Sequence, residues 1–351
     1  MNLTAVFYAL IAAVLFGIST PVAKVLVGST HPVVLAGLLY CGAGVGVAVL
    51  RKLPWEIFGS RRAREAALNR ADLPWLAGAV VAGGVVGPIL LLVGLTRTDA
   101  STASLLLTLE GVATALMAWF IFHESFDRRI ATGMLCLAVG AMVLSWSGTP
   151  TLESIVGPLA VIGACVAWGL DNNLTRKISL ADPLQIVTLK GTIAGPVNLL
   201  LGVAAGGALP DLSMGLIATI VGFLCYGVSL ALFVLALRHL GSARTAAYFS
   251  TAPFFGAVAA VITLHESITY QPAAAGALMA VGVWLHVTEQ HDHEHAHETQ
   301  EHTHAHIHDE THQHSHGPND PAGEPHTHRH THKPLTHSHP HMPDMHHQHR
   351  H

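Results

Sequence analysis

Three ionisable residues, Glu110, Asp171 and Lys190, stand inside long stretches of mainly apolar residues. An ionisable side chain inside a bilayer is costly unless it is paired or hydrated, so such residues are functional candidates. We expect Glu110 to take and release a proton or to contact a cationic substrate. The alternative is that Glu110 only bonds a neighbouring hydroxyl.

Two amides follow the second of these residues, in the run Asp171-Asn172-Asn173. Their oxygen and nitrogen atoms can serve as ligands or hydrogen-bond partners in a central cavity. Lys190 is expected at a similar depth on the next span, so it can pair with Asp171. A structural Asp171–Lys190 ion pair that fixes two helices is therefore the alternative to a binding role.

Helix breaks within apolar stretches give further candidates. Pro21 follows Ser19 and Thr20, and Pro253 follows Thr251. A proline inside a helix removes one backbone hydrogen bond and frees a carbonyl. We expect Ser19, Pro21 and Thr251 to offer polar groups to a substrate, or the hydroxyls to satisfy the freed backbone.

The triplet His-Glu-Ser occurs at residues 123–125 and again at 265–267. A zinc protease needs a second histidine one helical turn after the first, but Asp127 and Thr269 stand there. The triplets are expected to cap helices or gate the two halves. Neither a phosphate loop nor a Gly-x-Ser-x-Gly motif occurs, and the sequence does not predict an enzyme.

The last 63 residues carry 22 of the 27 histidines, many in His-x-His repeats. Imidazole suits Zn, Ni, Co and Cu, so we expect residues 289–351 to bind such ions, although no cofactor is required. Having almost no aliphatic residues, this tail is predicted to be disordered. The candidate metal ligands are His291, His293, His295, His297, His302, His304, His306, His308, His312, His314 and His316.

The remaining sequence has the composition of a membrane protein. Over the whole chain 51% of residues are hydrophobic and 11% are charged, against about 25% charged in soluble proteins. A bilayer core needs about 20 apolar residues per helix. The sequence predicts an all-α integral membrane protein with ten spans, near 3–27, 33–50, 74–95, 101–122, 130–147, 153–174, 183–203, 214–237, 244–264 and 272–288.

Lysine and arginine predict the orientation. With the N-terminus in the cytoplasm, twelve of them fall at inner ends and loops and two at outer ends. Ten spans also return the C-terminus to the cytoplasm. We therefore expect a multi-pass protein of the plasma (inner) membrane, with lipid around it and no nucleic-acid partner.

Two halves of the chain, 3–147 and 153–288, echo each other. Phe16-Gly17 with Lys24 corresponds to Trp168-Gly169 with Arg176, and the His-Glu-Ser triplets recur 142 residues apart. Five spans per half place the second copy upside down relative to the first. Inverted repeats are typical of secondary transporters that expose a midplane site alternately to each side.

On these motifs the chain resembles the EamA-type transporters of the drug/metabolite transporter superfamily. The resemblance implies a fold of five plus five helices and the export or uptake of small metabolites, amino acids or drugs. The sequence leaves the oligomeric state open, with a homodimer as one alternative. The leading hypothesis is alternating-access transport of a small polar metabolite, with a proton as the candidate coupling ion. The alternatives are export of Ni, Co or Zn fed by the tail, and a membrane-anchored metal-binding or sensing protein that transports nothing.

Overall fold

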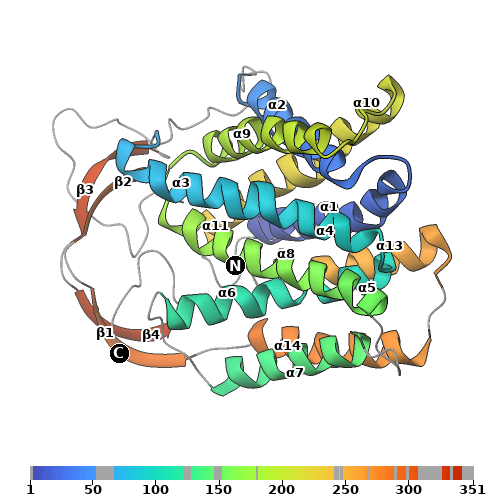
Figure 1. Ribbon diagram of the computed structural model, residues 1–351. Coiled ribbons are helices and arrows are strands. Elements are labelled where there is room, and N and C mark those ends of the chain that lie inside the picture. Colours follow the sequence, from blue (N-terminus) through green and yellow to red (C-terminus); the bar gives the residue numbers. More distant parts are fainter. Residues whose placement is uncertain are drawn as a thin grey trace.

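The computed structural model describes residues 3–52, 67–121, 128–145, 152–178, 181–240, 245, 248–266 and 269–287. It also describes four short segments of the tail, at 291–297, 300–306, 326–332 and 335–341. The body is a bundle of helices whose axes run roughly alongside one another, and the tail segments lie at one end of the bundle (Figure 1).

The first half of the chain is helical throughout its described residues, apart from short turns. Its elements are α1 (Leu3–Val27), α2 (Pro32–Lys52), the 3₁₀ turn η2 (Arg70–Asp72), α3 (Leu73–Ala79), the π-helical segment η3 (Val80–Val86), α4 (Gly87–Leu95), α5 (Ala100–Leu106), α6 (Leu109–Phe120) and α7 (Arg128–Ser145). The segments α3, η3 and α4 follow one another without a gap and form one long helix.

The second half has the same character. Its elements are α8 (Leu152–Lys177), α9 (Pro183–Ala204), α10 (Leu212–Val221), the π-helical segment η4 (Gly222–Val228), α11 (Ser229–Leu240), α13 (Ala252–Leu264) and α14 (Tyr270–Val287). Here α10, η4 and α11 form one continuous helix, as α3, η3 and α4 do in the first half.

Seven helices in the described residues are long and apolar enough to cross a membrane, and two shorter apolar helices span Ala131–Leu144 and Ala252–Leu264. Their lipid-length apolar runs make the chain a multi-pass membrane protein. The prediction of a membrane protein built from helices is thus confirmed. The number of ten spans and their inverted arrangement stay predictions.

Two predicted spans differ in detail. The span expected at 244–264 becomes helix α13 only from Ala252, because Pro253 occupies its first turn, where a missing N–H costs nothing. Thr245, Tyr248 and Phe249 are also helical, so the described part of this span is interrupted at Ser250 and Thr251, directly before α13 and Pro253. The span expected at 101–122 is divided between α5 and α6 by a turn at Leu107 and Thr108.

Close helix packing rests on small residues. Helices α2 and α9 have the most extensive contact in the bundle, and α1 lies along α13 and α11 while α8 lies along α6 and α4. A Cβ added at Gly44 or Gly191 would overlap the backbone of the other, so these two glycines let α2 and α9 approach closely. Such contacts between small residues are the usual way in which membrane helices associate.

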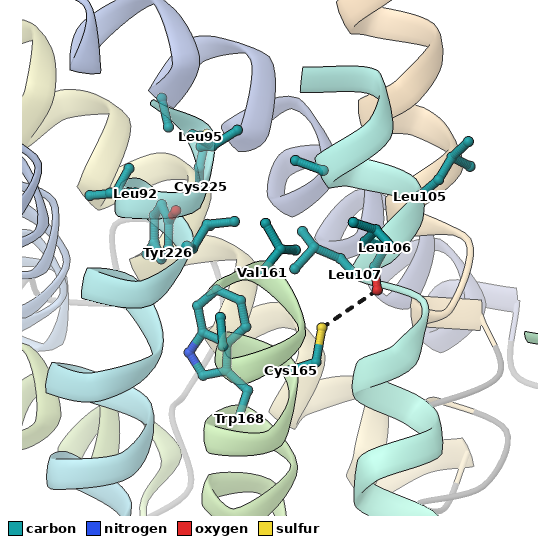
Figure 2. Close-up of a cluster of buried hydrophobic side chains, with 14 of the residues drawn as sticks. Leu92, Leu95, Leu105, Leu106, Leu107, Val161, Cys165, Trp168, Cys225 and Tyr226 are labelled. Carbon is teal, nitrogen blue, oxygen red and sulfur yellow. Dashed lines mark hydrogen bonds between the residues drawn. The ribbon is translucent and has the colours of Figure 1, made fainter. Parts of the chain in front are cut away.

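A cluster of buried apolar side chains joins the two halves. It includes Leu92, Leu106, Val161, Trp168 and Tyr226, which come from α4, α5, α8 and η4 (Figure 2). Within it the thiol of Cys165 donates to the carbonyl oxygen of Leu106, at 3.5 Å. This carbonyl ends α5, so the thiol bonds a backbone group at the break in the helix.

The described part of the tail consists of four short strands, and the disorder expected for the tail as a whole stays a prediction. Strand β1 (His291–His297) pairs with β4 (Leu335–His341), and β2 (Gln300–His306) pairs with β3 (His326–His332), both antiparallel. The His-x-His repeat has the two-residue period of a β-strand. The predicted ligands His308, His312, His314 and His316 lie outside the described residues.

Candidate functional site

A buried ion pair lies between α8 and α9. The ammonium group of Lys190 donates to both carboxylate oxygens of Asp171, each at 2.6 Å. The hydroxyl of Thr175 donates to Asp171 Oδ1 at 2.8 Å, and both charged residues are buried. The predicted pair is present, and its two charges cancel each other.

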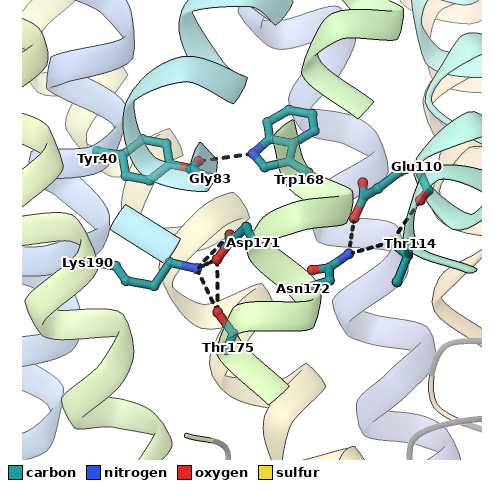
Figure 3. A network of polar contacts seen from close by, with 9 residues as sticks. All are labelled: Tyr40, Gly83, Glu110, Thr114, Trp168, Asp171, Asn172, Thr175 and Lys190. Carbon is teal, nitrogen blue, oxygen red and sulfur yellow. Dashed lines mark hydrogen bonds and ion pairs between the residues drawn. The ribbon is translucent and has the colours of Figure 1, made fainter. Parts of the chain in front are cut away.

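A second carboxylate lies one helix away. Glu110 stands in the first turn of α6 and accepts a hydrogen bond from Asn172 Nδ2 through Oε1, at 2.8 Å (Figure 3). Thr114 lies one turn along α6, where its hydroxyl donates to the Glu110 carbonyl and lies 3.2 Å from Asn172 Nδ2. An amide, not a cation, is therefore the partner of this carboxylate.

Asn173 has a structural role beside Glu110, Thr114 and Asn172. Its amide nitrogen donates to the carbonyl oxygens of Gly169, at 2.8 Å, and Thr114, at 3.1 Å. The bond to Thr114 joins α8 to α6, the bond to Gly169 lies within α8, and together they use both N–H groups of a buried side chain. Asn173 therefore positions the helices, while the exposed Asn172 remains able to meet a solute.

The π-helical segment η3 contributes a carbonyl to the same region. Gly83 O accepts from the hydroxyl of Tyr40, at 2.6 Å, and from Trp168 Nε1, at 3.0 Å (Figure 3). A Cβ added at Gly83 would overlap the carboxylate of Asp171. The absence of a side chain therefore allows η3 to lie directly against the ion pair. Single-turn π segments within helices are frequent at functional sites.

The break between α5 and α6 determines the position of Glu110. Leu107 and Thr108 form a turn, and α6 begins again at Leu109. A negative side chain in the first turn of a helix is stabilised by the unpaired N–H groups there. Discontinuous membrane helices of this kind line binding sites in transporters.

Ser19, Pro21 and Thr251 lie elsewhere in the fold. The hydroxyl of Ser19 donates to Phe16 O at 2.5 Å, and that of Thr251 to Tyr248 O at 2.6 Å, each within its own segment. Pro21 is buried inside α1. The structure brings together Glu110, Asp171, Asn172, Asn173 and Lys190, and it shows no bond from them to the other three.

Four aromatic rings, those of Tyr40, Tyr226, Phe16 and Trp168, contact one another in series. The Phe16 ring lies edge-on to those of Trp168 and Tyr226, with centroids 6.1 and 5.9 Å apart. The Tyr40 ring lies 5.9 Å from that of Tyr226. Phe16 and Trp168, which correspond in the two repeats of the sequence, thus meet between the halves.

The second His-Glu-Ser triplet acts as a cap, one of the two roles expected for it. His265 ends α13 in the left-handed conformation, with φ 53° and ψ 34°. The carboxylate of Glu266 then accepts from the backbone N–H groups of Ala100 and Ser101, at 2.8 and 2.9 Å, at the start of α5. The first triplet, at 123–125, lies outside the described residues.

Lys24 of α1 fixes the beginning of the turn between α4 and α5, and Glu266 caps the end of that turn. Its ammonium group donates to the carbonyl oxygens of Leu95 and Thr98, at 2.6 and 2.8 Å. The turn between α4 and α5 is therefore fixed by a cation from α1 and by Glu266 of the second half. A pocket of about 390 Å³ lies beside it, lined by Asp99, Ser101, Thr102, Leu144, Glu266, Thr269, Gln271 and Pro272.

Metal ligands do not gather in the body of the protein. Among the side chains that the structure describes, no group of three or more His, Cys, Asp or Glu could hold a metal ion. The four cysteines are free, and Cys165 and Cys225 are buried. Metal binding by the tail stays a prediction.

Several residues of the site were missed by the sequence reasoning. Thr114 and Thr175 stand four residues after Glu110 and Asp171, a spacing that places them on the same helix face and that could have found them. Tyr40 had no such signal, because its partner is a backbone carbonyl of a π-helical segment. Ordinary helical periodicity does not foresee that geometry.

Comparisons with known proteins agree on the kind of protein. The model of the EamA-like transporter family matches residues 3–146 and again 155–288. An "Uncharacterized transporter" of Methanothermobacter thermautotrophicus is 28% identical over 286 residues, which cover 78% of this chain and 83% of the relative. The "Uncharacterized transporter YvbV" of Bacillus subtilis is 27% identical over 203 residues, 55% of this chain and 65% of the relative.

A shorter relative matches part of the chain. The "Probable 4-amino-4-deoxy-L-arabinose-phosphoundecaprenol flippase subunit ArnE" of Pseudomonas paraeruginosa is 33% identical over 110 residues, 31% of this chain and 91% of the relative. A solved structure titled "Crystal structure of protein" has the same fold, with a TM-score of 0.58 and 16% identity, over 81% of this chain and 96% of that one.

Proposed function

Because the chain belongs to the EamA-like transporter family, we propose that it moves a small polar metabolite across the inner membrane by alternating access. Glu110 is the coupling residue, which binds a proton on one side and releases it on the other. The observation that carries this role is a carboxylate in the membrane-spanning body, bonded to an amide and placed next to a helix break.

Internal symmetry supports alternation between two halves. The family model matches the chain twice, and the π-helical segments η3 and η4 begin 142 residues apart, the same interval as between the His-Glu-Ser triplets. Helix α1 packs against α13, as its counterpart α8 packs against α6. We infer ten spans in two inverted halves, with both termini in the cytoplasm. One chain then supplies both halves, and the mechanism does not require a homodimer.

The cap formed by Glu266 gives this mechanism a contact between the halves. It joins the loop after α13 in the second half to the start of α5 in the first. Opening the bundle on this side requires these two hydrogen bonds to break. The structure therefore corresponds, in this proposal, to a state closed at that end.

Flux measurements in reconstituted vesicles test the proposal. The purified protein is placed in vesicles that contain a pH-sensitive dye, and amino acids, amines, sugars and metal ions are added in turn. A lipid-linked amino sugar belongs in the panel because of the similarity to ArnE. A solute whose flux moves protons with the wild type, but not with Glu110→Gln, is expected. The absence of protein-dependent flux for every solute would refute transport of a small polar metabolite.

We propose export of Zn, Ni or Co as a second candidate function, on the basis of the His-x-His pattern of the tail. The pairing of the strands places histidines opposite histidines, for example His304 opposite His328 and His293 opposite His339. Imidazole is a ligand that suits Zn, Ni, Co and Cu. We propose that the tail binds several such ions.

Removal of residues 289–351 tests whether the metal bound by the tail is transported or only stored. Zinc or nickel bound per chain should fall sharply in the shortened protein, as measured by elemental analysis after dialysis. If the metal is cargo, metal flux into vesicles is lost as well. If the tail is a buffer only, metal binding is lost while metabolite flux stays the same. Equal metal content in both proteins would contradict metal binding by the tail.

A further inference from the structure

The charges around the site do not sum to zero. Lys190 contacts both oxygens of Asp171, so this pair is neutral as a unit. Glu110 is the other carboxylate of this network, and in the part of the chain that the structure describes it has no cationic partner. The network of Glu110, Asp171 and Lys190 therefore has one uncompensated negative charge when Glu110 is ionised. Inside a membrane such a charge favours binding of a cation.

Two oxygen acceptors remain open beside that charge. Glu110 Oε1 and Asn172 Nδ2 bond each other, which leaves Glu110 Oε2 and Asn172 Oδ1 without a partner among the described residues. Figure 3 shows both side chains side by side between α6 and α8. Two acceptors on neighbouring side chains match two N–H donors of one ammonium group.

Glu110 and Asn172 are accessible, unlike the buried ion pair. The Glu110 side chain is partly exposed, and Asn172 is exposed. Apart from its chain neighbours and the backbone of its own helix, no atom lies within 4 Å of the position that a Cβ would occupy at Gly111, the next residue. Glu110 is therefore more accessible than Asp171, which is buried.

We propose that Glu110 and Asn172 form the binding site for the ammonium group of the transported solute. The substrate class is then a small organic cation with N–H donors, such as an amine or an aminated metabolite. A metal ion fits less well, because Ca²⁺ or Mg²⁺ takes six or more ligands and the described side chains offer this carboxylate and this amide. The inference rests on the proposed function and names its cargo.

Because ionised Glu110 has one negative charge, the site holds either a proton or a substrate cation. A proton on Glu110 removes the charge that holds the ammonium group, so proton and substrate occupy the site in turn. One proton is then exchanged for one monovalent cation, and no net charge crosses the membrane. The Asp171–Lys190 pair takes no part in this exchange and keeps α8 and α9 in place.

Thermal stability of the purified full chain in detergent provides the test. The probes are two amines, ethanolamine and benzylammonium, each compared with its neutral counterpart, ethylene glycol and benzyl alcohol. The amines, but not the neutral compounds, are expected to raise the melting temperature at pH 8. The apparent affinity should fall about tenfold for each pH unit below the point where Glu110 gains its proton.

Variants assign the effect to the two side chains. Glu110→Gln and Asn172→Ala should weaken amine binding by about tenfold or more, since each removes a bond to a charged group. Asp211→Asn is the matched control, because Asp211 is an exposed carboxylate that caps α10 away from this site. Glu110→Asp keeps the charge and should retain part of the binding, which separates loss of charge from misfolding.

Two results would overturn the inference. One is equal stabilisation by the amines and their neutral counterparts. The other is unchanged amine binding by Glu110→Gln. Either result leaves the proposed function standing if protein-dependent, proton-coupled flux of a neutral solute is found in vesicles.

Discussion

Single residues carry distinct tasks even though they lie a few ångströms apart. Asp171 and Lys190 neutralise each other, Asn173 joins two helices, and Glu110 with Asn172 stays open to a solute. The sequence alone identified all five as candidates, because charged and amide groups are rare in apolar stretches. It could not separate structural from binding roles, since that depends on which groups pair across helices.

Breaking the buried ion pair should be costly. Asp171→Asn leaves the Lys190 ammonium buried without a counter-charge, and we expect a loss of about 3–5 kcal/mol in the free energy of unfolding. The double variant Asp171→Asn with Lys190→Met should recover most of that loss. Thermal unfolding in detergent measures both. An Asp171→Asn variant as stable as the wild type would show that the pair does not hold α8 and α9 together.

Two glycines offer a matched comparison. Gly83→Ala places a methyl group against the Asp171 carboxylate and should destabilise the protein, because the backbone of η3 must move away. Gly111→Ala meets no neighbouring atom and should be neutral or stabilising by up to about 1 kcal/mol, because alanine favours a helix. Their melting temperatures are compared directly. Equal effects would mean that η3 does not lie against the ion pair.

The exposed carboxylate of Asp211 caps the N-terminus of α10, and this cap depends on pH. The Met214 N–H and the Ser213 hydroxyl donate to Asp211 and lower its pKa below the ordinary value. The stabilisation is therefore present above the unfolded pKa and is lost as the pH falls through the lower folded pKa. Amide exchange at the start of α10 should speed up on acidification relative to Asp211→Ala. The same pH dependence in both proteins would rule out this cap.

At the level of elements, the interruptions within the helices position the site residues more directly than the regular helical stretches do. The interruption at Leu107 and Thr108 starts a new helix just before Glu110, and η3 brings Gly83 O to Tyr40 and Trp168. Apolar stretches predict that a span exists, because burial in lipid requires it. They do not show where hydrogen bonding changes within a span, and neither π-helical segment was foreseen.

The cap at α5 can be tested without a substrate. Glu266→Gln replaces a charged acceptor of two N–H bonds with a neutral one and should cost about 1 kcal/mol, with faster fraying of α5. A cysteine at Ser101 should then react faster with a maleimide than in the background with Glu266. Glu266→Asp serves as the control that keeps the charge. Unchanged labelling would show that Glu266 does not hold this end closed.

For the whole molecule, the sequence predicted a helical membrane protein and its family, and both are confirmed. Composition and hydropathy show whether a helix is surrounded by lipid or by water, so a helical membrane protein can be predicted from the sequence. For the tail, the low apolar content predicts disorder, whereas the His-x-His alternation also has the two-residue period of a β-strand. The disorder of the tail therefore stays a prediction.

Topology is open to direct measurement. Cysteines introduced at Asn69 and Thr96, at the two ends of the helix from α3 to α4, should be labelled from opposite sides of the membrane. The excess of arginine near the first end places Asn69 on the cytoplasmic side. An impermeant maleimide on intact cells reads this out in a background without the native cysteines. Labelling of both positions from one side would exclude the proposed orientation.

The π-helical segments at Val80–Val86 and Gly222–Val228 also bear on the history of the gene. A π segment arises when one residue is inserted into an α-helix, and two independent insertions at matching places are a poor explanation for an equal spacing. A single insertion in an ancestor half this length, copied when that ancestor duplicated, accounts for both. Two descendants of one segment now do different work, since Gly83 of the first lies against an ion pair and Cys225 stands in the corresponding place of the second.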